Sequence, residues 1–225
     1  MSAHPHRGEP LPSDVAPRPA PGPAAAAAAD GYALLGIGRP GPRIARRLPA
    51  GVVAVRHRAL EALLQPAPFG PCAPDRAAVL KHQRALEQAM RRGPVLPAPC
   101  GVVFRGRAAV LRFLEEQYAP LDAALDFLAG RVELRVHVLP HADRPAGELR
   151  AAGARLYHAL RRRARAAIPC PCGERRVLSA AFLVERAEWV AFVEHAHDLA
   201  AEHPELAVDV TGPWPPYDFV RWSAG

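Results

Sequence analysis

Regular alternations of apolar and polar residues are clearest in the second half of the chain. Residues 131–139 and 206–210 alternate in this way, which predicts two strands, the first with one solvent-facing side. Residues 148–166 and 185–202 carry apolar side chains every three or four positions and predict two amphipathic helices. Residues 177–184 are apolar on both faces, as in a central strand. This half is therefore expected to be a small sheet covered by helices.

Strands in the first half are marked by shorter apolar runs. Residues 32–37 and 51–55 predict two strands, and residues 58–64 predict a short helical turn. Residues 95–104 are extended in character but contain Pro97 and Pro99, so a strand there should be broken or lie at a sheet edge.

Two helices are predicted in the same half. Asp75 is placed to cap a helix that runs through Arg92, and Val79, Leu86 and Met90 are expected on its apolar face. A longer helix is predicted over 107–129 and should kink or break near Pro120, which lacks a backbone donor.

The predicted fold class is α+β, with two small sheet-plus-helix domains of which at least one is ferredoxin-like. Residues 30–129 are expected to form an N-terminal ferredoxin-like domain, and residues 130–225 a C-terminal α+β domain that resembles it. Residues 1–29 hold seven prolines and six consecutive alanines. Such a segment buries too little apolar surface to offset its loss of chain entropy, so it is predicted to be a disordered tail.

Composition limits the possible functions. The 225 residues carry a formal charge of +7, but Lys81 is the only lysine, and the abundant arginine, alanine, proline and glycine share GC-rich codons. Coding bias therefore explains the charge at least as well as nucleic-acid binding. No uncharged apolar run is long enough to span a membrane, and residues 1–30 lack the order of a signal peptide, so a cytoplasmic protein is expected.

Cofactor and catalytic motifs are weak in this sequence. Cys170 and Cys172 form a C-x-C pair, which is tighter than usual zinc-site spacing, and no second pair follows. An unliganded loop is favoured over a metal site, although Cys72 or Cys100 could join such a site in the fold. No phosphate-binding loop, serine-hydrolase or zinc-protease motif is found, so neither a cofactor nor enzymatic activity is expected.

An unusual string, TGPWPPY, follows the last predicted strand. Its three prolines remove backbone donors, so we expect it to end the sheet and to hold its aromatic side chains rigidly. Two interpretations remain open: the aromatic residues cover the protein's own core, or they bind a partner. The candidate partner-binding residues are Thr211, Gly212, Pro213, Trp214, Pro215, Pro216, Tyr217 and Phe219.

The string TGPWPPY followed by Phe219 resembles the C-terminal signature of the GvpF/GvpL gas vesicle proteins. Weaker matches in the family's order are 32–37 (YALLGI), 95–97 (VLP), 154–157 (ARLY) and 181–184 (AFLV) with Phe192, so that the resemblance covers roughly 30–219. One departure concerns 97–101, PAPCG, where the family usually has Pro-x-Arg-Phe-Gly. A cysteine replaces the aromatic residue there.

The resemblance implies two α+β domains, one of them ferredoxin-like, without known catalysis. It also implies a role at the gas vesicle, with binding to the small hydrophobic shell protein GvpA and to other accessory Gvp proteins. The competing hypothesis is a basic ferredoxin-like nucleic-acid-binding protein. The exposed side of 131–139, predicted to hold Arg131, Glu133, Arg135 and His137, lacks the aromatic residues with which such sheets bind RNA, so we do not expect a nucleic-acid partner.

Overall fold

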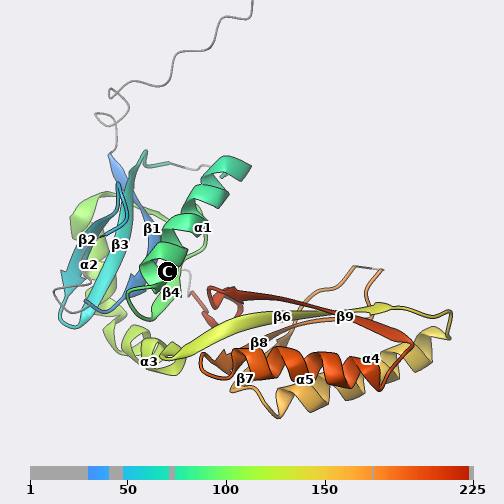
Figure 1. Ribbon diagram of the computed structural model, residues 1–225. Coiled ribbons are helices and arrows are strands. Elements are labelled where there is room, and N and C mark those ends of the chain that lie inside the picture. The colour runs from blue at the N-terminus through green and yellow to red at the C-terminus, as the bar shows by residue number, and fades with distance from the viewer. Residues whose placement is uncertain (1–29, 41–47, 71–73, 174, 223–225) are drawn as a thin grey trace, which may run out of the picture.

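The computed structural model describes residues 30–40, 48–70, 74–173 and 175–222 (Figure 1). The predicted tail, residues 1–29, lies outside the described residues. Two antiparallel sheets with associated helices divide the described chain into a first unit, before Gly130, and a second unit after it. The predicted α+β class is confirmed. In this part of the chain no helix combines the length and the hydropathy that crossing a membrane requires.

The first unit has a helical layer on each side of its sheet. Its strands are β1 (Gly31–Gly38), β2 (Val53–His57), β3 (Leu60–Ala67), β4 (Val95–Pro97) and β5 (Val103–Phe104), and its helices are α1 (Arg76–Met90), α2 (Gly106–Glu116) and α3 (Tyr118–Leu128). The strand order is β2-β3-β1, with β4 and β5 both pairing with the other side of β1. Leu35 packs toward Leu86 of α1, whereas Leu34 belongs to the core beneath Leu114 of α2 and Leu125 of α3.

The second unit is the ferredoxin-like one. Its elements are β6 (Arg131–Pro140), α4 (Ala146–Arg161), β7 (Ala166–Pro169), β8 (Leu178–Glu185), α5 (Trp189–Ala201) and β9 (Leu206–Trp214). This is the β-α-β-β-α-β order, and the sheet order β7-β8-β6-β9 makes β9 an edge strand. Both helices pack on the same core, in which Phe182 contacts Phe192 with ring centroids 5.4 Å apart.

The prediction that the first unit would also be ferredoxin-like is wrong. Its described elements follow the order β-β-β-α-β-β-α-α. The difference arises at residues 58–64, which were predicted to form a helical turn but belong mostly to strand β3. Leu63 pairs with both β1 and β2, so these two ladders stabilise an extended conformation that local propensity did not indicate.

The helices of the first unit also differ in detail from the prediction. The helix predicted over 107–129 is interrupted at Gln117, not at Pro120. Pro120 lies in the first turn of α3, where its missing N–H leaves no helical bond unmade. In α1 the cap is confirmed, because the Asp75 carboxylate accepts a hydrogen bond from the Ala78 N–H at 2.7 Å. Val79, however, is 42% exposed and does not join the core.

A peptide after β9 joins the two units. The chain leaves the edge strand, forms a 3₁₀ turn (Tyr217–Phe219) and returns to the first unit, where Trp222 contacts Pro97 of β4 and Phe113 of α2. Phe219, Val220 and Trp222 pack against the first unit's core, and Leu183 of β8 is buried in that same core. We call residues 215–222 the return peptide.

Candidate functional site: a groove between the units

The TGPW part of the candidate string continues strand β9 instead of ending it. Thr211 pairs with Arg135, and Trp214 pairs with Glu133, with a bulge between the two pairs. The expectation that the prolines would stop the sheet is wrong, because β9 is an edge strand and Pro213 sits within the bulge, where the ladder needs no donor.

Gly212 is required at this bulge for two reasons. Its φ is +125°, a conformation that side chains rarely adopt, and a Cβ built on it would lie 2.9 Å from the Glu133 carbonyl oxygen. A larger residue would therefore push β9 away from β6. The close approach fixes the direction in which Pro213 and Trp214 leave the sheet.

The PPY part of the string is an internal anchor. Pro215 and Pro216 are buried, and Tyr217 packs against the cluster that contains Leu35 and Leu86. Burial raises the pKa of the Tyr217 hydroxyl to about 12. With Phe219 on the first core, this half of the string contacts the protein itself, as the packing interpretation expected.

A buried ionic network holds the return peptide to β6. The Glu133 carboxylate accepts hydrogen bonds from the Asp218 backbone N–H at 3.1 Å and from Arg135 Nε at 2.9 Å, and Arg135 also pairs with Asp218 at 2.9 Å. Glu133 was predicted on an exposed face, but its relative exposure is 0% because the return peptide covers it. Burial, followed by the nearby Asp218 charge, raises the pKa of Glu133 to about 7.

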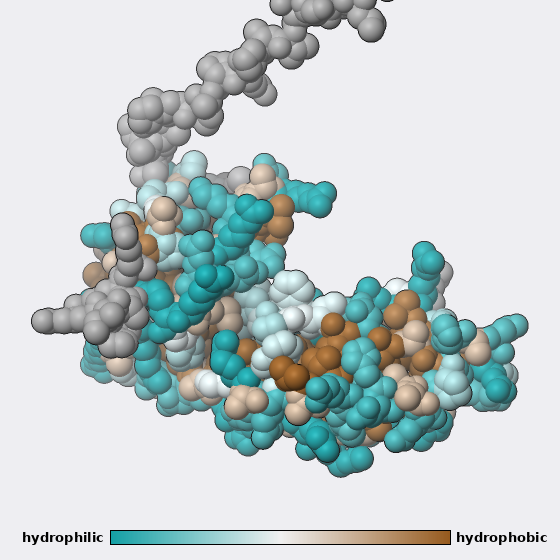
Figure 2. Space-filling model, in the orientation of Figure 1, coloured by the Kyte–Doolittle hydropathy of each residue, from teal (hydrophilic) through white to brown (hydrophobic). Residues whose placement is uncertain are grey.

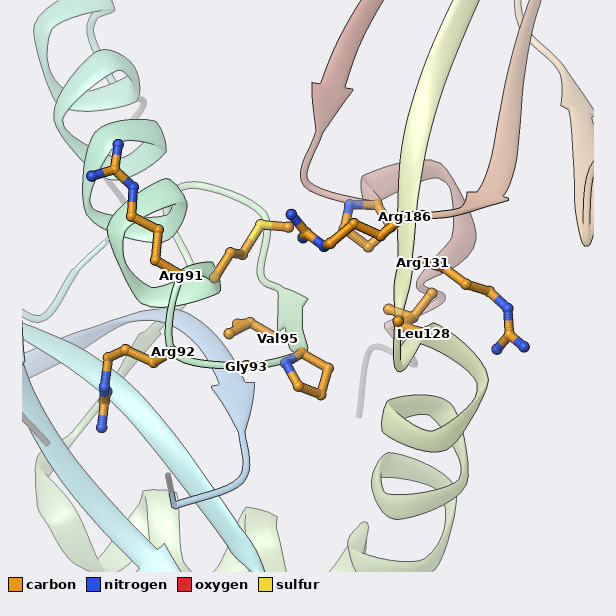
Figure 3. A pocket seen from close by; sticks show the side chains of 11 residues that line it. Arg91, Arg92, Gly93, Val95, Leu128, Arg131 and Arg186 are labelled. Carbon is orange, nitrogen blue, oxygen red and sulfur yellow. The ribbon is translucent and has the colours of Figure 1, made fainter. Parts of the chain in front are cut away.

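Two adjoining cavities form a groove between α1 and the second unit. The larger has a volume of about 380 Å³ and the smaller about 270 Å³, and they share Met90, Arg91 and Arg186. Figure 3 shows the larger one, where Arg186 extends from the end of β8 toward α1. Pro213, Trp214 and Pro215 line the smaller cavity, together with Glu87 and Val132. Pro216 lines the larger cavity, so the string and the groove meet at residues 213–216.

Trp214 is oriented by its own strand. Its indole N–H donates a hydrogen bond to the Thr211 hydroxyl at 3.1 Å, and the side chain stays partly accessible. The polar tip is therefore satisfied within the protein while the apolar ring lines the cavity. Thr211, Trp214 and the bulge at Gly212 act together to present this ring.

An apolar surface lies on the second unit. Figure 2 shows hydrophobic side chains gathered over β9 and α5. Half-buried residues of these two elements include Val193, Val208 and Val210, and Val190 at the start of α5 is 49% exposed. Because β9 is the edge strand, its outer side chains are only partly covered by the helices.

The described residues offer little for metal or acid–base chemistry. Nowhere among them do three His, Cys, Asp or Glu side chains gather as a metal site would need. Cys172 is exposed. Burial, followed by the charge of Asp218 at 3.8 Å, raises the pKa of the Cys170 thiol. The groove is lined by guanidinium and apolar groups and suits binding.

Sequence reasoning missed several residues of this region. Trp222, Arg135 and Asp218 hold the return peptide, and Arg91 and Arg186 line the groove. A signal existed for Trp222, since Phe219, Val220 and Trp222 place three large apolar side chains within four positions, which favours burial of this segment. No comparable signal marks the arginines, because arginine is common throughout the chain.

The fold and the groove define a class of protein: two α+β units, one ferredoxin-like, joined by a C-terminal peptide that borders a groove between them. The family model described as "Gas vesicle synthesis protein GvpL/GvpF" matches residues 32–152 and 142–221. The chain therefore belongs to the GvpL/GvpF family of gas vesicle proteins.

Individual relatives agree with this assignment. The chain is 29% identical to gas vesicle protein F2 of Halobacterium salinarum over 153 residues, which cover 66% of this chain and 70% of the relative. It is 33% identical to gas vesicle protein L of a Streptomyces species over 165 residues, covering 55% of this chain and 61% of the relative.

Solved structures share the fold. The crystal structure of the gas vesicle protein GvpF from Anabaena superposes with a TM-score of 0.74 at 20% identity, covering 86% of this chain and 97% of that one. GvpF from Microcystis aeruginosa gives a TM-score of 0.68 at 17% identity and covers 86% and 100% of the two chains.

Proposed function

We propose that this protein is a non-enzymatic accessory factor that binds the hydrophobic shell protein GvpA, and other accessory Gvp proteins, during gas vesicle assembly. It would work in the cytoplasm and at the growing vesicle, and it would shield the apolar surface of the shell protein before insertion. The family supports a gas vesicle role. The binding of GvpA and other Gvp proteins, and the shielding of the apolar surface of GvpA, are what we propose beyond this role.

The observation that carries this proposal is the placement of Trp214. Its ring is fixed by the bond to Thr211 and lines a cavity of about 270 Å³ between the units. Rigid, partly accessible tryptophans contribute strongly to protein interfaces because little side-chain entropy is lost on binding. Val208 and Val210 of the apolar surface lie on β9, the strand that leads to Trp214, and together with Val193 of α5 they extend the area open to a hydrophobic partner.

The eight residues of the candidate string take different parts in this proposal. Pro213, Trp214 and Pro215 would contact the partner. Thr211 and Gly212 orient them, Tyr217 and Phe219 fix the return peptide on the first unit, and the buried Pro216 lines the larger cavity. We also propose that 30–129 and 130–225 are the two domains, with the return peptide closing one onto the other.

Co-expression with GvpA tests the proposal. Wild-type protein should keep GvpA soluble and co-purify with it, and Trp214→Ala should reduce the captured GvpA by roughly tenfold, as for an interface hot spot. Leu111→Ser is the matched control, because Leu111 is 41% exposed and belongs to α2, which packs on the other face of the first sheet from α1. Equal capture by wild type and Trp214→Ala, or failure of the wild type to bind, would contradict the proposal.

A further inference from the structure

Arginine side chains surround the groove between the units. Arg91, Arg92, Arg131 and Arg186 line the larger cavity (Figure 3). Two of them are engaged elsewhere: Arg92 lies 3.8 Å from the buried Glu61 carboxylate, and Arg131 pairs with Glu185 at 2.8 Å. In Figure 3 both side chains, like that of Arg91, point away from the larger cavity, whereas Arg186 extends across it toward α1.

The other two arginines remain available. Arg91 and Arg186 are exposed, and neither forms an ion pair with a carboxylate in the part of the chain that the structure describes. Both line the larger and the smaller cavity. Glu87 is the one carboxylate among the described lining residues, so the groove carries an excess of positive charge.

Apolar groups lie between these charges. Met90 lines both cavities. The buried residues Val95 and Leu128 line the larger cavity, and Trp214 lines the smaller one. A groove with guanidinium groups beside apolar side chains is complementary to a peptide that has carboxylates next to apolar side chains. Arginine forms paired hydrogen bonds with carboxylates, and exposed guanidinium groups lose little hydration when they do so.

We infer that this groove binds an acidic, partly apolar segment of a protein partner, whose carboxylates pair with Arg91 and Arg186. The inference rests on the proposal that the groove is a docking site, and it adds the chemistry of the segment that docks. A nucleic acid fits less well. Trp214 is the single aromatic residue among the described lining residues, whereas single strands are held by several stacked aromatic rings.

Peptide binding to the full chain tests the inference. The probe is a fluorescein-labelled decapeptide of alternating Glu and Leu with blocked ends, and its control has Gln in place of Glu. Fluorescence anisotropy is measured with wild type, with Arg91→Gln/Arg186→Gln, and with Arg112→Gln/Arg150→Gln. The last variant loses the same charge at exposed arginines of α2 and α4, which do not line the groove.

The acidic peptide should bind wild type at least roughly tenfold more tightly than the Gln peptide does, and the Arg91→Gln/Arg186→Gln variant should bind the acidic peptide at least roughly tenfold more weakly than wild type. The Arg112/Arg150 variant should bind like wild type. Equal weakening by the two double variants, or no preference for the acidic peptide, would overturn the inference. It would also be overturned if an oligothymidylate strand bound at the same arginines more tightly than the peptide.

The same variants separate this inference from the proposed function. If Arg91→Gln/Arg186→Gln still captures GvpA while Trp214→Ala does not, the proposal that GvpA docks at the groove stands. The inference that the groove binds an acidic segment is then rejected. If the peptide binds through the arginines but Trp214→Ala leaves GvpA capture unchanged, the inference stands and the proposed function fails.

Discussion

The Trp222 indole N–H donates a hydrogen bond to the Pro97 carbonyl at 2.9 Å and so joins residues 125 positions apart in the chain. Pro97 is the last residue of β4, and Trp222 follows the return peptide's 3₁₀ turn. The Trp222 ring also stacks on Phe113 of α2, with ring centroids 6.2 Å apart. This contact fastens the end of the return peptide to β4 and α2 of the first unit.

Replacing Trp222 should therefore destabilise the whole chain. Trp222→Phe keeps the ring packing but loses the hydrogen bond, and should lower the free energy of unfolding by about 1 kcal/mol. Trp222→Ala also loses the packing and should cost about 2 kcal/mol or more. Urea unfolding measures both. Trp189→Phe is the control, since Trp189 packs on the second core without a hydrogen bond among the described residues. Equal losses of unfolding free energy for Trp222→Phe and Trp189→Phe would contradict the role of Trp222 as an anchor of the return peptide.

Glu133 should make stability depend on pH. Its pKa rises from 4.5 to about 7 on folding, so the native state holds this proton more tightly than the unfolded chain. Its contribution to stability is therefore greatest below pH 4.5 and falls as the pH rises toward 7, by roughly 3 kcal/mol in all.

Glu133→Gln should remove this contribution, because glutamine does not titrate. Unfolding free energies of wild type and the variant, measured between pH 4.5 and pH 7.5, should converge at low pH, with the variant the more stable at high pH. A constant difference across this range would show that the Glu133 carboxyl does not titrate differently in the two states.

Gly212→Ala should disturb the bulge beside Glu133. The added methyl group would lie 2.9 Å from the Glu133 carbonyl oxygen in a conformation with φ of +125°, so we expect a loss of about 2 kcal/mol or more. Gly173→Ala is the control, because a Cβ there would meet nothing within 4 Å. Calorimetric unfolding of both variants checks the prediction, and a Gly212→Ala protein as stable as the control would contradict it.

The cysteines should differ in reactivity. Cys172 is exposed, whereas partial burial and the Asp218 carboxylate raise the pKa of the Cys170 thiol and lower its thiolate fraction. At pH 8 a maleimide should modify Cys172 roughly tenfold faster than Cys170. Peptide mass spectrometry after timed labelling gives the two rates. Equal rates would mean that Cys170 is not held beside Asp218 in solution.

Elements with their own periodicity could be predicted from the sequence. Alternation over 131–139 indicated β6, and helical spacing around Trp189 and Phe192 indicated α5. Strand β7 was missed, because Ala166 and Ala167 have little strand propensity and extend the apolar pattern of the preceding helix. Its conformation follows from pairing with β8, which is a tertiary contact.

The candidate site was predicted only in part. The string 211–217 drew attention to Trp214, which does line the groove. The alternation of β6 placed Glu133 on an exposed face, because a peptide that returns 85 residues later leaves no trace in the local pattern. Arg91 and Arg186 come together only through the packing of the two units, which periodicity does not report.

Site-specific photocrosslinking in cells that make GvpA shows whether the Trp214 side of the groove contacts the shell protein. Trp214→p-benzoylphenylalanine places a photoreactive ring in the groove, and Leu111→p-benzoylphenylalanine places the same ring on the surface of α2. We expect a GvpA crosslink from position 214 and none from position 111. Crosslinking from position 111 alone, or from neither position while the vesicles still form, would contradict it.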